Sequence, residues 1–229
     1  MNVFFDALLE LFWPTRCVLC NRSGYVLCPF CKSKLSFINP KYACKFCGAP
    51  FGYLSCTACK KDWEIDFVVC ALSFDEGAGE VVKSYKDKRE RRLKDFIASS
   101  LYEAYLAASL DEYKFDWLCY VPASKQAMQK RGFDHMKQVA LQLQEYLAIP
   151  CAPLLKKDKR KDQRRLSRKD RSANMQAAFS LDEQFDLRGA SILLIDDVIT
   201  SGATIREASL ALKAAGAKRV VALAFARVW

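Results

Sequence analysis

One short stretch of the sequence combines an apolar run, two carboxylates and a small hydroxylated loop. Residues 192–204 read Ile-Leu-Leu-Ile-Asp-Asp-Val-Ile-Thr-Ser-Gly-Ala-Thr. The apolar run Ile192–Ile195 predicts a buried parallel strand, and Asp196 and Asp197 follow at its carboxyl end. Ligands of parallel α/β sheets bind outside the carboxyl ends of the strands. The two carboxylates are therefore expected at a ligand site, where they are the candidate catalytic residues.

The residues after the acidic pair predict a phosphate-binding loop, which consists of Thr200, Ser201, Gly202, Ala203 and Thr204. A glycine-containing loop that leads into a helix presents backbone N–H groups and the positive end of the helix dipole to a phosphate. The hydroxyl groups add donors, and the aspartates accept from sugar hydroxyls or hold Mg²⁺. Together these groups predict a phosphorylated ribose held at both ends. The alternative is a strand that ends in acidic turn residues before an ordinary helix.

Four Cys-x-x-Cys pairs near the N-terminus predict metal binding: Cys17/Cys20, Cys28/Cys31, Cys44/Cys47 and Cys56/Cys59. Two such pairs complete a tetrahedral Cys₄ site, so the eight cysteines predict two structural zinc ions. Sequential pairing closes shorter loops than interleaved pairing, which remains the alternative. Disulfides would need an oxidising compartment, and no secretory signal pattern is visible. Redox-active pairs are a further alternative, but four pairs in succession favour metal.

The other cysteines and the histidine attract no functional prediction. Cys70, Cys119 and Cys151 each lie alone in or beside apolar segments, so we expect them to be buried as small hydrophobic residues. His135 is the single histidine, and it lies among polar neighbours at the start of a helical stretch. The sequence offers it no catalytic partner.

Positive charge is concentrated in two segments. Lys156–Arg171 holds ten basic and three acidic residues, and Lys83–Lys94 holds seven basic and two acidic residues. Their net charges of +7 and +5 sum to +12, which exceeds the total of +10, so the rest of the chain has a net charge of −2. Local basic character suits an anionic ligand or a polyanion. Solvated surfaces on a helix and a loop are the alternative interpretation.

After residue 65 the sequence alternates strand-like and helix-like segments. Strands are expected at Phe67–Phe74, Trp117–Val121, Ser191–Ile195 and Val220–Ala226. Helices are expected at Gly79–Lys86, Leu93–Ala108, Phe133–Leu147 and Ile205–Ala215. Such alternation builds a parallel sheet with helices on both faces. The expected fold class is therefore α/β, a doubly wound and mostly parallel sheet preceded by a small double zinc-ribbon module.

The predicted organisation has three parts: an amphipathic helix over residues 1–13, a double zinc ribbon over 14–62 and the α/β domain over 66–229. The N-terminal helix is expected to dock on the zinc module, with a peripheral membrane contact as the alternative. The sequence has no run of about 18 uncharged apolar residues, so no transmembrane segment is expected. A cytoplasmic location is expected with it.

In several separate motifs the sequence resembles the ComF family of competence-associated proteins, in which a double zinc ribbon precedes a domain of the type I phosphoribosyltransferase kind. The stretch Asp196–Thr204 resembles the phosphoribosyl pyrophosphate (PRPP) motif. The other matching motifs, in chain order, are Ser84-Tyr85-Lys86, Val121-Pro122, Arg131-Gly132-Phe133, Gln163-x-x-Leu166-Ser167-x-x-x-Arg171-x-x-Asn174 and Ala178-Phe179. Ser201 replaces the usual threonine, and Asp134-His135 replaces the usual Asn-Gln.

The resemblance implies roles for residues at the site. The acidic pair would contact the ribose hydroxyls, and the loop of residues 200–204 would cradle the 5-phosphate. Mg²⁺ would accompany PRPP, whose pyrophosphate leaves C1 through an oxocarbenium-like transition state. Lys125, Lys130 and Arg131, in the loop after a predicted strand, are candidates for binding the pyrophosphate. A long polar loop carries Arg164, Arg165, Arg168 and Arg171, which are candidates for covering the site or for binding nucleic acid.

Three functions follow from these observations. The first is a protein of DNA uptake and natural transformation that binds PRPP or a related ribose phosphate. The second is an active phosphoribosyltransferase of nucleotide salvage or biosynthesis. The third is a non-catalytic scaffold that binds single-stranded DNA or a DNA-uptake helicase. The intact motif argues against the third function as a complete account, whereas no residue distinguishes binding from turnover.

Overall fold

The computed structural model describes residues 14–51, 56, 65–157 and 179–229. The predicted N-terminal helix lies outside this range, as do Cys59 and most of the basic segment that begins at Lys156. The described helices and strands, in chain order, are α2 (Pro29–Lys32), η1 (Pro40–Tyr42), β1 (Phe67–Ser73), α3 (Glu76–Lys86), α4 (Leu93–Ala107), η2 (Leu110–Glu112), β2 (Trp117–Tyr120), α5 (Lys125–Arg131), α6 (His135–Leu147), β3 (Leu155–Lys157), β4 (Phe179–Leu181), β5 (Ser191–Ile199), α7 (Ala203–Ala214) and β6 (Arg219–Arg227).

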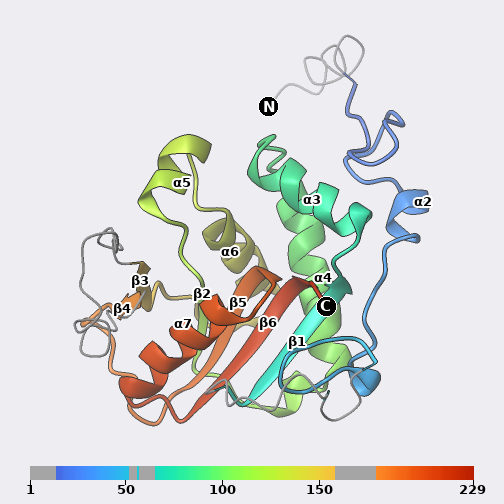
Figure 1. Cartoon of the computed structure of the whole chain (residues 1–229). Coiled ribbons are helices and arrows are strands. Elements are labelled where there is room, and N and C mark those ends of the chain that lie inside the picture. Colours follow the sequence, from blue (N-terminus) through green and yellow to red (C-terminus); the bar gives the residue numbers. More distant parts are fainter. Residues whose placement is uncertain (1–13, 52–55, 57–64, 158–178) are drawn as a thin grey trace, which may run out of the picture.

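A parallel sheet of four strands, in the order β1-β6-β5-β2, forms the centre of the α/β domain (Figure 1). Its central strands β5 and β6 are almost continuously buried, which explains why both read as unbroken apolar runs. β3 and β4 form a separate antiparallel pair, and β3 includes the first two residues of the basic segment. The predicted parallel α/β fold is confirmed.

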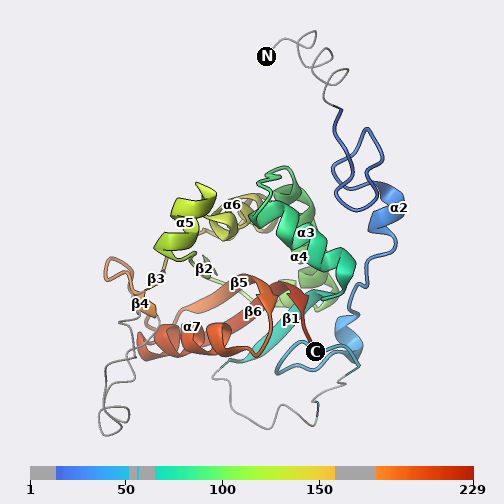
Figure 2. The same cartoon turned by 45° about the horizontal axis from the view of Figure 1, so that its top comes forward.

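Helices cover both faces of the sheet. Figure 2 shows α3, α4, α5 and α6 on one side and α7 on the other. On the first side, Leu193 and Phe225 pack with residues of α4 and α6. On the second side, the small side chains of Ala222 and Ala224 pack with the apolar stripe of α7, in which Ile205 is buried. Because side chains alternate along a strand, each central strand contributes to both layers of the core.

The cysteine-rich segment covers the free edge of β1. The backbone N–H of Ile38 donates to Ala71 at 2.9 Å, and the N–H of Ser73 donates to Ser36 at 2.8 Å. Farther along the same edge, the N–H of Val68 donates to the carbonyl of Lys45 at 2.8 Å. An uncovered edge strand would present unpaired backbone groups to other chains. The N-terminal segment thus pairs with the backbone N–H and C=O groups at the edge of β1. These hydrogen bonds fix the segment to the α/β domain.

Two predictions that concern the site were wrong. β5 does not end at Ile195 but continues to Ile199, because β6 pairs with it beyond the acidic residues. Lys125, Lys130 and Arg131 lie in helix α5 and not in a loop. The Ser124 side chain caps the start of that helix, and Gly132, with φ of 79°, ends it.

Among the described residues, no helix is both long enough and apolar enough to cross a bilayer.

Candidate functional site

The acidic pair lies within β5, near the carboxyl edge of the sheet. Both side chains are buried, with 7% of Asp196 and 9% of Asp197 exposed. The backbone N–H of Asp197 donates to Oδ1 of Asp196 at 2.9 Å, which orients the first carboxylate. Pairing of β5 with β6 continues on either side of the pair, so the strand backbone holds both carboxylates rigidly.

Two side chains from distant parts of the sequence meet on Asp197. Nε2 of His135 lies 2.5 Å from Oδ2 of Asp197, and the ammonium group of Lys86 forms an ion pair with the same oxygen. Lys86 is the last residue of α3, and His135 is the first residue of α6. The ends of two helices therefore bring a cation and an imidazole onto the carboxylate.

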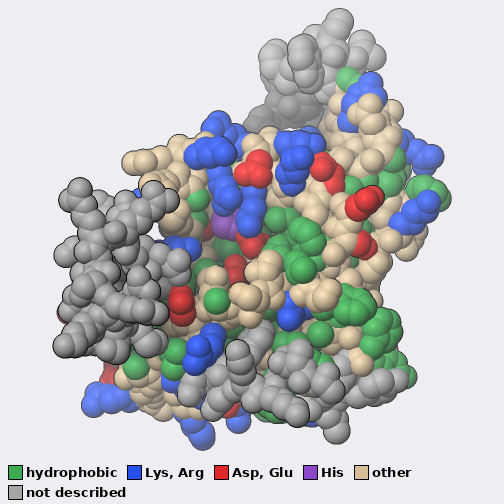
Figure 3. Space-filling model, in the orientation of Figure 1, with side chains coloured by type: hydrophobic (Ala, Val, Ile, Leu, Met, Phe, Trp, Pro, Cys, Tyr) green, Lys and Arg blue, Asp and Glu red, His purple; other side chains and the backbone are tan. Residues whose placement is uncertain are grey.

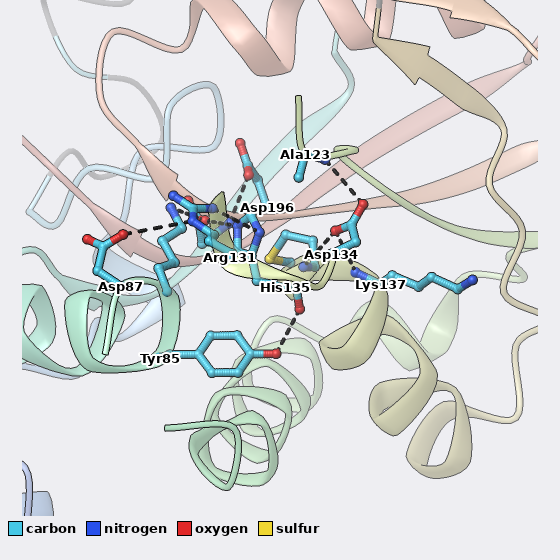
Figure 4. A network of polar contacts seen from close by, with 11 residues as sticks. Tyr85, Asp87, Ala123, Arg131, Asp134, His135, Lys137 and Asp196 are labelled. Carbon is cyan, nitrogen blue, oxygen red and sulfur yellow. Dashed lines mark hydrogen bonds and ion pairs between the residues drawn. The ribbon is translucent and has the colours of Figure 1, made fainter. Parts of the chain in front are cut away.

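Further hydrogen bonds fix the orientation of His135 (Figure 4). Nη1 of Arg131 lies 3.4 Å from Nδ1 of His135, and the hydroxyl of Tyr85 donates to the His135 carbonyl at 2.8 Å. A guanidinium can only donate, so Nδ1 is the acceptor and the proton on Nε2 points to Asp197. Asp134 caps α6 by accepting from the N–H of Met136, which sets where the imidazole stands.

The two carboxylates differ in their affinity for a proton. Burial raises the pKa of Asp196 to about 8, and the charge of Asp197 acts in the same direction. Burial also acts to raise the pKa of Asp197, but the hydrogen bond from His135 and the charge of Lys86 outweigh it and hold that pKa below its ordinary value. Near neutral pH the pair therefore retains one proton, with the negative charge on Asp197.

The residues after β5 form the loop that the motif predicts. Gly202 has φ of 78°, a left-handed conformation that favours glycine, and it is the residue from which α7 begins. No side chain caps the helix through this position, although Ser201 Oγ accepts weakly from the N–H of Ala203 at 3.4 Å. Thr200 and Thr204 are exposed. Backbone N–H groups at the start of a helix suit an anion, and phosphate binding at the N-terminal end of α7 stays a prediction.

The predicted basic residues of α5 are only partly brought to this site. Arg131 contacts His135 and lies 3.8 Å from the carboxylate of Asp87. Lys125 and Lys130 are exposed on the helix surface. Figure 3 shows the histidine at a hollow in the surface, with side chains of Lys and Arg around it and carboxylates nearby. Arg164, Arg165, Arg168 and Arg171 lie outside the described residues.

The cysteines gather into two clusters. The sulfur atoms of the first cluster, Cys17, Cys20, Cys28 and Cys31, lie within 4.8 Å of one another, as do those of the second, Cys44, Cys47 and Cys56. The backbone N–H of Cys28 points to Sγ of Cys17 at 3.4 Å, and that of Cys56 points to Sγ of Cys44 at 3.3 Å. Four converging thiols with N–H groups that favour thiolates fit a structural zinc ion. The clusters join neighbouring pairs, in agreement with sequential pairing.

The isolated cysteines do not contribute to either cluster. Cys70 and Cys119 are buried, as predicted, and burial raises the pKa of each thiol to about 12. Cys151 is only partly buried.

Comparison with known proteins agrees with both halves of this description. Residues 127–227 match the phosphoribosyl transferase domain model, and residues 8–60 match the double zinc ribbon domain model. The chain is 27% identical to Competence protein F of Haemophilus influenzae, covering 94% of this chain and 98% of that protein. It is 26% identical to Competence protein ComFC of Streptococcus pneumoniae, covering 93% and 100%.

The chain therefore carries a double zinc ribbon domain followed by a phosphoribosyltransferase domain, and along nearly its whole length it is similar to two competence proteins. Among solved structures, the structure of the allosteric regulatory enzyme of purine biosynthesis has 20% identity and a TM-score of 0.41. That similarity covers 57% of this chain and 25% of the other.

Sequence reasoning missed two polar residues of this site. His135 was left without a partner, although it contacts Asp197 across a separation of 62 residues. Lys86 was noted only as part of a family motif and of the basic segment Lys83–Lys94, although it forms an ion pair with the same carboxylate. One signal was present in the sequence, since His135 departs from the glutamine that the resemblance described above implies at this position. The contact itself depends on the packing of α6 against the sheet.

Proposed function

We propose that this protein acts in DNA uptake and natural transformation as a member of the ComF family, and that it binds PRPP or a related phosphorylated ribose together with Mg²⁺. The observation that carries the proposal is the buried acidic pair of β5 followed directly by the Gly202 loop and the start of α7. The names of the two competence proteins support the biological context. The thiol-rich zinc clusters favour a reducing compartment, and we place the protein in the cytoplasm.

Each part of the ligand has a suitable partner at the site. Asp197 carries the negative charge of the pair and is the better acceptor for ribose hydroxyls or for Mg²⁺. The loop of residues 200–204 and the positive end of α7 suit the 5-phosphate. Lys86 and Arg131 lie beside the acidic pair and supply positive charge for a pyrophosphate. The zinc clusters have no open coordination position in this proposal and serve the structure.

The proposal predicts that Mg²⁺ and PRPP together stabilise the protein. A ligand at 100 times its dissociation constant adds about 2.7 kcal/mol to the free energy of unfolding. For a chain of this size that corresponds to a rise in Tm of roughly 5–10 °C. Thermal unfolding with Mg-PRPP, compared with Mg²⁺ and ribose 5-phosphate or Mg²⁺ and pyrophosphate, measures the effect. No rise in Tm with saturating Mg-PRPP would overturn the proposal.

Pyrophosphate release tests whether binding is accompanied by turnover. We would incubate the protein with Mg-PRPP and a panel of purine and pyrimidine bases and measure pyrophosphate. A base-dependent release would assign the protein to the active phosphoribosyltransferases. Binding without release for any base would support a role in which the ribose phosphate is a bound effector.

A second proposed role, in which the basic segment binds single-stranded DNA, depends on the net charge of +7 in Lys156–Arg171. This charge exceeds what one pyrophosphate needs. Neutralising Arg164, Arg165 and Arg168 together is expected to weaken DNA binding and to flatten its salt dependence by about 0.7 log units for each phosphate that is no longer neutralised. Titration of single-stranded DNA at several salt concentrations measures both quantities.

The same triple variant separates DNA binding from a role in covering the ligand. If the segment covers the site, the variant loses affinity for Mg-PRPP and keeps its DNA binding. Unchanged binding of both ligands would exclude both roles and leave a protein partner, such as a DNA-uptake helicase, as the explanation of the charge.

A further inference from the structure

Arg227, the last residue of β6, is a buried cation whose described acceptors are all backbone carbonyl oxygens. Only 9% of the residue is exposed. Nε donates to the carbonyl of Cys47 at 2.7 Å, and Nη1 donates to the carbonyls of Ile199 at 3.1 Å and Thr200 at 2.5 Å. Nη1 also contacts the carbonyl of Val228. A guanidinium stays protonated in proteins, so its charge depends on these acceptors when water is excluded.

The acceptors belong to two parts of the molecule with different chemistry. Cys47 is a member of the second cysteine cluster. Ile199 ends β5, and Thr200 begins the loop that leads into α7. The one guanidinium therefore joins the backbone of a metal cluster to the backbone of the proposed phosphate loop, across a sequence separation of 180 residues in the first case and 28 in the second.

The backbone around Cys47 is closely fitted to the α/β domain. Gly48 has φ of 68°, and a Cβ atom added there would lie 2.5 Å from Sγ of Cys70 on β1. The N–H of Gly48 donates to the carbonyl of Cys44 at 2.8 Å, and the carbonyl of Lys45 accepts from β1. A zinc ion on the cluster would hold this turn closed, because its thiolates would otherwise repel one another. Zinc at this cluster would therefore fix the position of the Cys47 carbonyl.

The first cluster has different neighbours. Arg92, at the start of α4, donates to the Thr15 hydroxyl at 2.8 Å beside that cluster, and Lys32 lies 4.0 Å from Glu103 on α4. These contacts connect the first cluster to α4, whereas the contact through Cys47 connects the second cluster to the end of β5. The two clusters are therefore expected to differ in their effect on the loop.

We infer that Arg227 is a positioning residue that couples the second zinc site to the phosphate loop, so that zinc at this site raises the affinity for Mg-ribose phosphate and zinc at the first site does not. The inference rests on the proposed function of the loop. When the second site loses its metal, the Cys47 carbonyl shifts away from Nε, and the guanidinium no longer fixes the carbonyls of Ile199 and Thr200. Because coupling is reciprocal, Mg-PRPP in turn retains zinc at the second site.

The first test uses the unaltered full-length protein. Zinc occupancy would be measured at equilibrium against a competing chelator with a colorimetric indicator, with and without saturating Mg-PRPP. We expect Mg-PRPP to raise the zinc affinity of one site by about tenfold and to leave that of the other unchanged. Equal zinc affinities with and without the ligand, in protein that calorimetry shows to bind Mg-PRPP, would overturn the inference. Protein that binds no Mg-PRPP would instead overturn the proposed function.

Variants identify the residue that carries the coupling. Arg227→Met is expected to weaken Mg-PRPP binding by about tenfold or more, because hydrogen bonds from a charged group are removed, and to abolish the effect of Mg-PRPP on zinc affinity. Arg219→Met is the matched control, since Arg219 begins the same strand and stacks over Tyr113 at 4.9 Å. Arg227→Lys, which keeps the charge but not the fork of donors, is expected to keep zinc and lose this effect of Mg-PRPP on zinc affinity.

Cysteine substitutions test the difference between the clusters. Cys44→Ser is expected to lower the affinity for Mg-PRPP, whereas Cys17→Ser leaves it unchanged although each variant loses one zinc ion. Equal effects of the two substitutions would show general destabilisation and would overturn the inference.

Discussion

Replacing the acidic pair is expected to abolish the response of the protein to Mg-PRPP. Asp197 carries the negative charge of the pair, and hydrogen bonds to a charged group contribute about 1.5–3 kcal/mol each. Asp197→Asn is therefore expected to weaken binding by roughly tenfold to a hundredfold. The double variant Asp196→Asn with Asp197→Asn should show no measurable rise in Tm. Calorimetric titration with Mg-PRPP measures the single variant, and thermal unfolding measures both.

Asp111→Asn is a suitable control for this experiment. Asp111 is exposed in η2, which precedes β2 and lies at the amino end of the sheet. The Asp111→Asn variant should bind Mg-PRPP as the unaltered protein does. An undiminished Tm shift in the double variant would show that the acidic pair is not the site. The zinc content of each variant should remain unchanged, because neither carboxylate contacts a cysteine cluster.

Removing a zinc ligand is expected to have the largest effect on the N-terminal module. We expect close to two zinc ions per chain by elemental analysis, held by the eight cysteines from Cys17 to Cys59. Cys17→Ser together with Cys20→Ser should leave one zinc ion, because the clusters join neighbouring pairs. Structural zinc contributes about 10–16 kcal/mol to the folding of small zinc modules. The variant should therefore lose the protease resistance of residues near the first cluster.

Cys151→Ser provides the control for zinc binding. Cys151 is partly buried and belongs to neither cluster, so its substitution should leave two zinc ions. Less than one zinc ion in carefully purified unaltered protein would contradict the two-site assignment. Loss of both ions on substitution of the first cluster alone would contradict independent sites.

Local patterns in the sequence were sufficient for the four-stranded sheet, for helices α3, α4, α6 and α7 and for the cysteine clusters, whereas α5 was expected to be a loop. The apolar runs of β5 and β6 are buried on both faces, so they carry a signal that does not depend on their neighbours. The Cys-x-x-Cys pairs are equally local, since two residues of spacing already place both sulfurs on one ion. The loop from Thr200 to Thr204 is also contained in one continuous motif. The boundary of β5 was missed because pairing with β6, and not its own composition, extends the strand.

The partners of the acidic pair were decided by tertiary structure alone. Asp197 meets His135 and Lys86 only because α6 begins and α3 ends at the same edge of the sheet. Arg227 meets Cys47 only because the cysteine-rich segment covers the edge of β1. These contacts join residues far apart in the sequence and depend on how whole elements pack, which no local pattern encodes. The sequence by itself therefore determined which elements and motifs form, and the packing determined which charges act on one another.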